Sequence, residues 1–489
     1  MMLPLIADTL IRNAYVVTVD SERRVFTDGY VAFRNGRIVA IGPMATCNVV
    51  ATDTVEARGR LVLPGIANAH NHLIQVAFRG YNDDRWPVLD IPTAVSALLR
   101  QLYMLVGRLD EERTYLLTRL HLLELTKAGY TATHDEHFTN VIKTSVDGSW
   151  AAVEQSGLRG FLARCIVSSD NVPEAGRETA DAGLAEVERL RARFASDRIE
   201  VVPSFLNYQF LADPEDMRRI GEGARRMGAR MDIDMTDNSR GANLRKRGFD
   251  GGQVDYYRGF DLLAEPCYAG KAVNMRGHEF AQLAEHDARV AMVPVLRFFD
   301  GVGLPVHHLL EAGILPGIGT DAPMVSDSQS PFEAMRLIIL AQNIAVKREV
   351  AAGGAVPAQP LWATSERVIE MATIGGARTL FMDQVTGSLE VGKAADCVIV
   401  DLDDATMRPD WDRRRTIGSL VWGGGTQIVD SVFVAGKRLL AGGRSTIWDE
   451  ETVIREAEAM LRDVVAETGL DSLLPPRVPG STHRGWRYL

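Results

Sequence analysis

Cysteine is scarce in this chain of 489 residues, which has four: Cys47, Cys165, Cys267 and Cys397. They lie far apart and form no Cys-x-x-Cys pair, so the sequence predicts neither a thiolate zinc cluster nor a disulfide framework. We interpret these cysteines as small buried hydrophobic residues of a protein in a reducing compartment.

Long apolar runs and an excess of positive charge are missing as well. No run is long enough to span a bilayer, and residues 1–8 lack the basic segment and full apolar core of a secretory signal. The formal net charge is -10 at pH 7 and the charges are spread evenly, which argues against nucleic acid or a membrane surface as a partner. We expect a cytoplasmic protein that acts on a small molecule. We also expect a homo-oligomer, either a dimer or a tetramer.

The most informative feature that is present is the pair His70 and His72. Residues 61–64 and the short apolar step after Gly65 predict one buried parallel strand that carries both histidines at its C-terminal end. Residues i and i+2 of a strand point the same way, so both imidazoles can face one point. Two imidazoles would supply half of a four-coordinate shell for zinc or a related ion.

The middle of the chain alternates helix and strand signals. Residues 110–127 begin with acidic residues, have helical apolar spacing, stop at Gly129 and precede a strand at 130–133. Further helix and strand pairs are predicted at 214–227 with 231–235, 279–286 with 290–295, and 306–312 with 314–321. This repetition favours an α/β fold of the (β/α)8 barrel type over an open doubly wound sheet. In such barrels the chemistry lies at the C-terminal ends of the strands.

Both ends of the chain have a β pattern instead. Residues 31–40 predict two short strands around the turn Asn35-Gly36, and residues 431–440 have the same build. A closing helix is predicted from about Glu450 to Glu467 by its apolar spacing. We therefore predict three parts, which are a β-sandwich domain from 1–58 and 382–445, a barrel from 59–381, and a C-terminal helix and tail from 446–489.

The residues around the two histidines resemble the amidohydrolase superfamily, in particular its cytosine deaminase and triazine hydrolase branch. The shared residues are the run Pro-Gly-x-x-Asn-x-His-x-His-Leu at 64–73, the following Arg79-Gly80, and Gly-Thr-Asp at 319–321. The resemblance covers almost the whole chain. It implies a (β/α)8 TIM barrel, a small β-sandwich built from both termini, and a metal-dependent hydrolase.

The resemblance also implies a metal site in which His70, His72 and Asp321 bind one divalent ion, with zinc as the first expectation and iron or manganese as alternatives. Asp321 would take the proton of the water that the ion activates. The family's strand 5 ends in His-x-x-Glu, and residues 231–237 place Asp234 at the histidine and Asp237 at the glutamate. A carboxylate binds zinc, iron or manganese, so Asp234 is predicted as a further ligand. Asp237, one methylene shorter than glutamate, is predicted as the proton donor.

The histidine that ends strand 6 in the family corresponds to Lys271, with Asn274 three residues later. Lys271 could stabilise an oxyanion, or act as a base if burial lowers its pKa. The alternative is a surface lysine beside Gly270, because a slip of one residue in the alignment would remove Lys271 from the site.

The remaining candidates are predicted to contact the substrate; they are Gln75, Arg79, Trp86, His137, Asn207 and Asn274. The first three lie on the first barrel loop, where the relatives bind substrate. His137 resembles a pocket histidine of the triazine branch, and Asn207 stands where many relatives have a histidine. The loss of imidazoles at 207, 234 and 271 suggests a site retuned for an unusual substrate, or partly disabled.

The sequence therefore predicts a metal-dependent hydrolase that attacks an sp2 carbon of a small nitrogen-containing substrate, with a heterocycle as the first expectation. Ammonia, an amine or another group such as chloride would leave. One alternative is hydrolysis of an open amide, urea or carbamate bond. Another is a metal-depleted barrel that acts as a binding protein or as a non-hydrolytic lyase or decarboxylase. Metal content separates this last class from the others.

Overall fold

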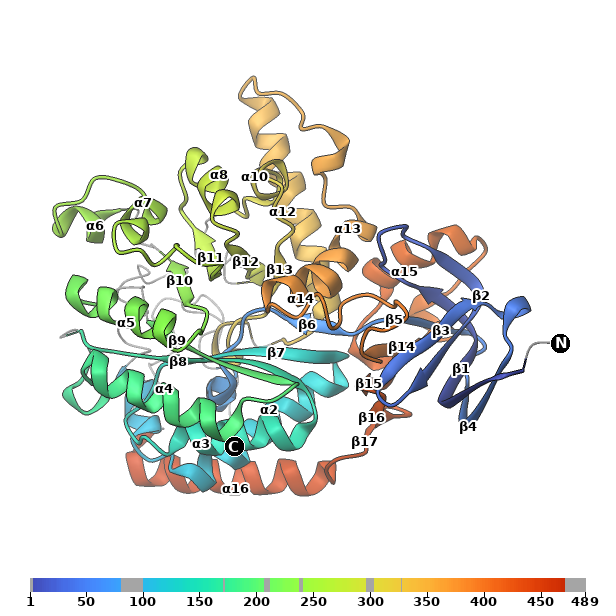
Figure 1. Ribbon diagram of the computed structural model, residues 1–489, viewed down its shortest axis with the longest axis horizontal. Helices are drawn as coiled ribbons and strands as arrows, with labels where there is room; N and C mark the ends of the chain where they lie inside the picture. Colours follow the sequence, from blue (N-terminus) through green and yellow to red (C-terminus); the bar gives the residue numbers. More distant parts are fainter. Residues whose placement is uncertain are drawn as a thin grey trace, which may run out of the picture.

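The chain builds two sheets, an eight-stranded barrel and a nine-stranded mixed sheet that joins both ends of the chain (Figure 1). This computed structural model describes residues 3–80, 100–169, 172–205, 212–236, 241–295, 303–326 and 328–470. The predicted TIM barrel with a small β domain from both termini is confirmed.

The barrel strands run parallel and lie side by side in sequence order. They are β6 (Ile66–Asn68), β7 (Tyr130–His137), β8 (Arg159–Cys165), β9 (Ile199–Phe205), β10 (Asp232–Thr236), β11 (Tyr268–Val273), β12 (Arg289–Met292) and β13 (Gly317–Ile318). The first and last strands meet where the amide of Ala69 donates to the carbonyl of Ile318, at 2.9 Å. This closure brings the C-terminal ends of all eight strands to one rim.

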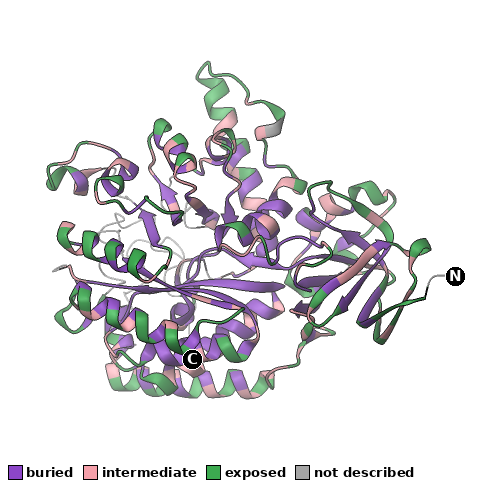
Figure 2. Cartoon of the chain, viewed as in Figure 1, coloured by how far each residue is buried: buried purple, intermediate pink, exposed green. Residues whose placement is uncertain are grey.

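Helices surround the barrel, and their buried inner faces pack against the outside of its strands (Figure 2). The longer ones are α2 (Glu111–Lys127), α3 (Ser145–Ser156), α4 (Ala180–Phe194), α5 (Pro214–Arg226), α8 (Gly277–Glu285) and α12 (Pro331–Ala351). The shorter ones are α6 (Ala242–Lys246), α7 (Gln253–Arg258), α10 (Val306–Glu311), α11 (Pro323–Ser326), α13 (Ser365–Glu370), α14 (Gly376–Thr379), α15 (Thr416–Gly423) and the 3₁₀ turn η2 (Leu73–Phe78). As its acidic start predicts, α2 is capped by Asp110, which accepts from the amide of Arg113 at 2.9 Å.

The mixed sheet combines strands from both termini, blue and orange-red in Figure 1. They are β1 (Leu5–Val17), β2 (Val25–Arg34), β3 (Arg37–Pro43), β4 (Val49–Glu56), β5 (Arg60–Pro64), β14 (Cys397–Asp401), β15 (Val429–Val434), β16 (Lys437–Ala441) and β17 (Arg444–Ser445). Both predicted hairpins are confirmed. Their two-residue turns have positive φ at both positions, 50° and 73° at Asn35 and Gly36, and 47° and 74° at Ala435 and Gly436.

The sequence predicted one strand in the apolar stretch before the two histidines, but the structure has two. β5 is antiparallel to β14 in the mixed sheet, and β6 is the first barrel strand, so the chain passes between the sheets at Gly65. A side chain at Gly65 would come within 2.0 Å of the hydroxyl of Thr131, which explains why glycine stands at this crossing. Two apolar runs that meet at Pro-Gly have the same hydrophobicity as one buried strand, and only the pairing distinguishes them. The range predicted for the barrel, 59–381, includes β5, but β5 pairs in the mixed sheet.

The C-terminal helix α16 (Glu450–Thr468) runs along α2 at the lower edge of Figure 1. Ion pairs between the two helices join Lys127 to Glu450 at 3.0 Å and Arg119 to Glu456. Its bounds agree with the predicted helix. Among the helices of the described residues, none is long and apolar enough to cross a membrane.

A buried ion pair connects the barrel to the mixed sheet. Arg159 of β8 donates from Nε to Oδ2 of Asp396 at 2.6 Å, and Asp396 also accepts from the amide of Ala435 at 2.7 Å.

Replacing Asp396 by alanine would leave the guanidinium of Arg159 buried without its counter-charge. We expect Asp396→Ala to lower the free energy of unfolding by about 3–5 kcal/mol in urea titrations. The exposed pair of Arg12 and Glu56 is the control, because Glu56→Ala should cost less than about 1 kcal/mol. Equal costs would contradict this structural role.

Candidate metal centre

The backbone after β6 brings the ring nitrogens of His70 and His72 to one point. Nδ1 of His70 lies 2.7 Å from the hydroxyl of Tyr268, which donates its own proton to the carbonyl of Ala69. Nδ1 must therefore carry a proton, and Nε2 has the lone pair. Nδ1 of His72 likewise donates to the carbonyl of Glu136 at 2.8 Å. Both rings thus present Nε2 as the free acceptor, the tautomer in which histidine binds a metal.

Asp321 reaches the same point from the opposite side of the barrel closure, directly after β13. Its amide donates to the carbonyl of His70, and its own φ is 62°. Gly319 permits this approach, because a side chain there would lie 2.5 Å from Cβ of His70. Asn68 and Thr320 exchange two hydrogen bonds, at 2.7 and 3.1 Å, across the same seam. Asn68, Gly319 and Thr320, which belong to the two sequence motifs, therefore have a structural role at this seam.

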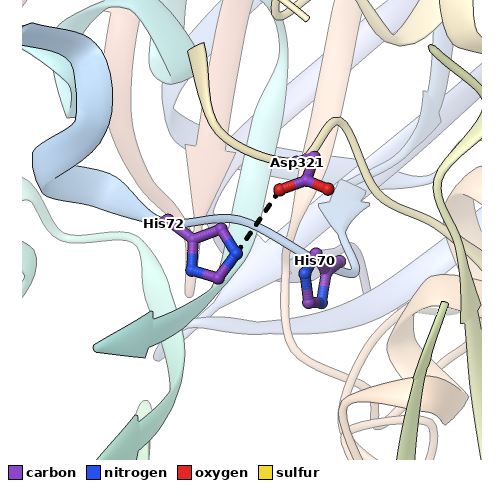
Figure 3. A group of neighbouring side chains, drawn as sticks. All are labelled: His70, His72 and Asp321. Carbon is purple, nitrogen blue, oxygen red and sulfur yellow. Dashed lines mark ion pairs between the residues drawn. The ribbon is translucent and has the colours of Figure 1, made fainter. Parts of the chain in front are cut away.

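Figure 3 shows how the three side chains converge. Oδ1 of Asp321 lies 3.4 Å from Nε2 of His72, and one ligand atom from each of His70, His72 and Asp321 lies within 4.8 Å of the others. All three side chains are buried. Nε2 of His70 and Oδ2 of Asp321 have no hydrogen-bond partner among the described residues. Buried acceptors normally have partners, so two imidazoles and a carboxylate left in this state fit a divalent ion.

The charges around the group also suit a cation. Burial and the nearby ammonium of Lys271 hold the pKa of His70 well below its usual range, so this ring is a neutral ligand. Burial alone would raise the pKa of Asp321, but Lys271 and the histidines outweigh it and lower the pKa well below the usual range. Burial would lower the pKa of His72, but the Asp321 carboxylate raises it. A proton on His72 and a cation therefore compete for one lone pair.

Lys271 lies at the barrel centre, which rules out the alternative of a surface lysine. Its side chain is 10% exposed, and Nζ lies 3.2 Å from Oδ2 of Asp234 and 3.7 Å from Oδ2 of Asp321. The register of β11 against β10 shifts beside Lys271, and φ is 63° at Lys271 and 46° at Ala272. This irregularity turns the lysine inward. Lys271, Ala272 and Asp321 all have a left-handed backbone conformation. Backbone strain of this kind is common at functional sites.

Asp234, the predicted further ligand, already has two partners. Its Oδ2 accepts from Lys271, and its Oδ1 accepts from the hydroxyl of Thr236 at 2.5 Å. It is not one of the three residues in the compact group. Metal ligation by Asp234 stays a prediction.

Four other predicted residues lie in the described part of the chain. Gln75 is buried in η2, and Asn274 follows β11 with φ 55°. Arg79 forms an ion pair with Glu124 of α2, on the outer side of the barrel. His137 ends β7 with Nδ1 3.7 Å from Oδ2 of Asp135. Their contact with substrate stays a prediction. The predicted site residues Trp86, Asn207 and Asp237 lie outside the described residues.

Sequence reasoning missed Glu136 and Tyr268, which support or line the centre. Period-two alternation on β7 places Glu136 and His134 on the same side of the strand, and this signal could have found Glu136. Nε2 of His134 lies 2.6 Å from Oδ2 of Asp232, and its ring stacks on Tyr268 with centroids 4.6 Å apart. Burial lowers the pKa of His134 to about 3, so its ring is neutral. The stack, which also contacts His70, holds the metal-facing imidazole in place.

Known proteins are similar to this sequence over nearly its full length. The profile of the amidohydrolase family matches residues 61–439. The chain is 28% identical over 470 residues to 5'-deoxyadenosine deaminase of Methanosarcina acetivorans, which covers 94% of this chain and 99% of that protein. It is 29% identical over 462 residues to 5-methylthioadenosine/S-adenosylhomocysteine deaminase of Desulforudis audaxviator, which covers 93% and 99%.

Solved structures share the fold. An adenosine deaminase of Xanthomonas campestris with bound zinc has a TM-score of 0.82 at 22% identity and covers 95% of this chain and 100% of its own. Atrazine chlorohydrolase TrzN of Arthrobacter aurescens, complexed with zinc, has a TM-score of 0.80 at 22% identity and covers 93% and 100%. The profile match spans most of the chain and includes the segments that carry His70, His72 and Asp321. This chain therefore belongs to the amidohydrolase family.

Proposed function

We propose that this protein is a metal-dependent hydrolase that replaces a substituent on an sp2 carbon of a nitrogen heterocycle by the oxygen of water. The observation that carries the proposal is the buried group of His70, His72 and Asp321. The sequence relatives are named as deaminases of adenine nucleosides, so an amino group on a purine-like ring is the first substituent to test. We propose zinc as the ion, because two similar structures are described with zinc. The cytoplasmic location and the homo-oligomeric state stay predictions.

A divalent ion bound by His70, His72 and Asp321 would supply a Lewis acid that lowers the pKa of water toward neutrality. The protein's own groups then manage protons and charge. Oδ2 of Asp321 has no hydrogen-bond partner among the described residues and can accept a proton from the water. The Lys271 ammonium, 3.7 Å from that oxygen, can donate to negative charge that develops on the substrate. As the carbon–oxygen bond forms and the carbon–nitrogen bond breaks, the leaving nitrogen must gain a proton.

Lys271 also favours a second candidate substrate class. An ammonium at the barrel centre is a hydrogen-bond donor with no acceptor, so it matches the carbonyl oxygen of an amide, urea or carbamate. Hydrolysis of such an open bond would use the same ion and the same Asp321. This alternative predicts that carbonyl compounds are turned over faster than aminated or chlorinated rings.

Metal analysis followed by a substrate screen tests the function. Protein purified without chelator should contain about one divalent ion per chain, and removing the ion should abolish activity that its return restores. The screen should contain adenine nucleosides, aminated and chlorinated triazines, and aryl ureas and carbamates, with release of ammonia, amine or chloride measured. Full activity in metal-free protein, or no metal in the purified wild type, would refute the proposal.

The predicted proton donor, Asp237, can be tested by comparing leaving groups. Asp237→Asn is nearly isosteric, so metal content should be unchanged. Turnover of an amine-releasing substrate should fall by roughly 10²-fold or more, because the departing nitrogen lacks its proton. Chloride needs no proton, so a chlorinated analogue should be much less affected. If both substrates lose activity equally, the acid is another residue, with Lys271 the first to examine.

A further inference from the structure

Glu136 lies beside the metal centre, and neither the sequence motifs nor the proposed mechanism uses it. Its side chain is fully buried at the end of β7. Oε1 accepts from the hydroxyl of Ser204 at 3.3 Å, whereas Oε2 has no hydrogen-bond partner among the described residues. That oxygen lies 3.8 Å from Nε2 of His72. A buried carboxylate oxygen without a donor is costly unless something else compensates it.

Three acceptor atoms at the centre therefore have no hydrogen-bond partner among the described residues: Nε2 of His70, Oδ2 of Asp321 and Oε2 of Glu136. Ligand atoms about 2.1 Å from a tetrahedral ion lie roughly 3.4 Å from one another. Nε2 of His72 lies 3.4 Å from Oδ1 of Asp321 and 3.8 Å from Oε2 of Glu136, and both distances are close to that spacing. Glu136 is not one of the compact group of three, so ligation requires its side chain to move toward the group.

The main chain of Glu136 is hydrogen-bonded to the segment that carries the two histidines. Its amide donates to the carbonyl of Asn71 at 3.0 Å, and its carbonyl accepts from Nδ1 of His72 at 2.8 Å. The same residue thus orients the His72 ring through its main chain and presents a free carboxylate oxygen to the other nitrogen of that ring. Asp234, by contrast, has both oxygens engaged by Thr236 and Lys271.

The charge balance agrees. The Lys271 ammonium lies 3.2 Å from Oδ2 of Asp234 and 3.7 Å from Oδ2 of Asp321, and this single positive charge can neutralise only one of the carboxylates of Asp234, Asp321 and Glu136. Two buried negative charges require compensation, and one divalent cation supplies it.

We propose that Glu136 is a protein ligand of the catalytic ion, supplied by the second barrel strand in place of the missing strand-5 histidine, while Asp234 and Lys271 form an internal ion pair. The inference rests on the proposed metal-dependent function. The ligand set would be two imidazoles and two carboxylates, from His70, His72, Glu136 and Asp321. A second carboxylate makes the site more favourable to manganese or iron than a shell rich in histidine.

Metal affinity is the readout, measured by competition with a chelator and by the visible absorption of the Co²⁺-loaded protein. Changes to residues that hydrogen-bond to metal ligands typically weaken metal binding by roughly 10- to 100-fold. Glu136→Gln should weaken metal binding by more than this, and it should alter the Co²⁺ spectrum. Asp232→Asn is the matched control, because it removes a nearby buried carboxylate that pairs with His134. It should leave the spectrum unchanged and the affinity within about 10-fold of wild type.

The double variant Asp234→Asn with Lys271→Met tests the competing ligand at constant net charge. It should keep both the affinity and the Co²⁺ spectrum if Glu136 is the ligand. Loss of metal in this double variant together with retention in Glu136→Gln would overturn the inference in favour of Asp234, and would leave the metal-dependent function intact. Equal weakening by Glu136→Gln and Asp232→Asn with unchanged spectra would also overturn it. Absence of stoichiometric metal from the wild type would instead refute the proposed function itself.

Discussion

His70→Ala is expected to abolish bound metal and hydrolysis together. Nε2 of His70 is buried, unprotonated and without a hydrogen-bond partner among the described residues. Together with His72, this ring faces Asp321. A shell that loses one imidazole rarely retains a catalytic ion, so kcat should fall to the background of the assay. Elemental analysis of the purified variant and turnover of the best substrate from the screen are the two measurements.

The control for this variant is His278→Ala. His278 lies near the start of α8 with its side chain 55% exposed, so its removal tests the effect of a lost histidine away from the centre. It should keep the metal content and kcat of the wild type. The hypothesis fails if His70→Ala retains one ion per chain and wild-type turnover. His72→Ala should behave as His70→Ala does, because the two rings share the site.

Asp321→Asn is expected to lower kcat by roughly 10²- to 10⁴-fold, the range for removal of a positioned general base. The amide keeps an oxygen that can still contact the ion, so part of the metal should remain. It cannot accept a proton from the water. Although burial opposes ionisation, Lys271 and the histidines hold the pKa of Asp321 well below its usual range, so the wild-type residue is a carboxylate at neutral pH. Measuring kcat at saturating metal separates the lost base from lost affinity.

The control is Asp383→Asn, which removes a carboxylate that pairs with Arg289 away from the metal centre. It should leave kcat within a factor of about two of wild type, as expected for a partly exposed pair of little energetic weight. If Asp321→Asn at saturating metal turned over as fast as Asp383→Asn, Asp321 would be only a ligand or a structural residue. The proton would then have to pass to another group.

The sequence alone predicted the fold class, and it singled out His70, His72 and Asp321, which the structure brings together. Period-two and period-3.6 patterns depend on neighbouring residues, so the repeated helices and strands, both terminal hairpins and α16 could be predicted from local spacing. His70 and His72 are two residues apart, and this spacing makes them face the same way in any extended segment. Asp321 was found through its motif, and its distance from His72 is a result of barrel closure.

Only the tertiary structure decided which residues from distant strands meet at the centre. Division of the apolar stretch at Gly65 depends on hydrogen bonds to two different sheets, which hydrophobicity does not encode. The inward turn of Lys271 depends on an irregularity in β11, and its pairing with Asp234 joins residues from adjacent strands. The position of Glu136 beside His72 depends on the lateral register of β7 against the first strand. Contacts between strands are set by packing across the whole barrel, and no local pattern in one strand specifies its neighbour's side chains.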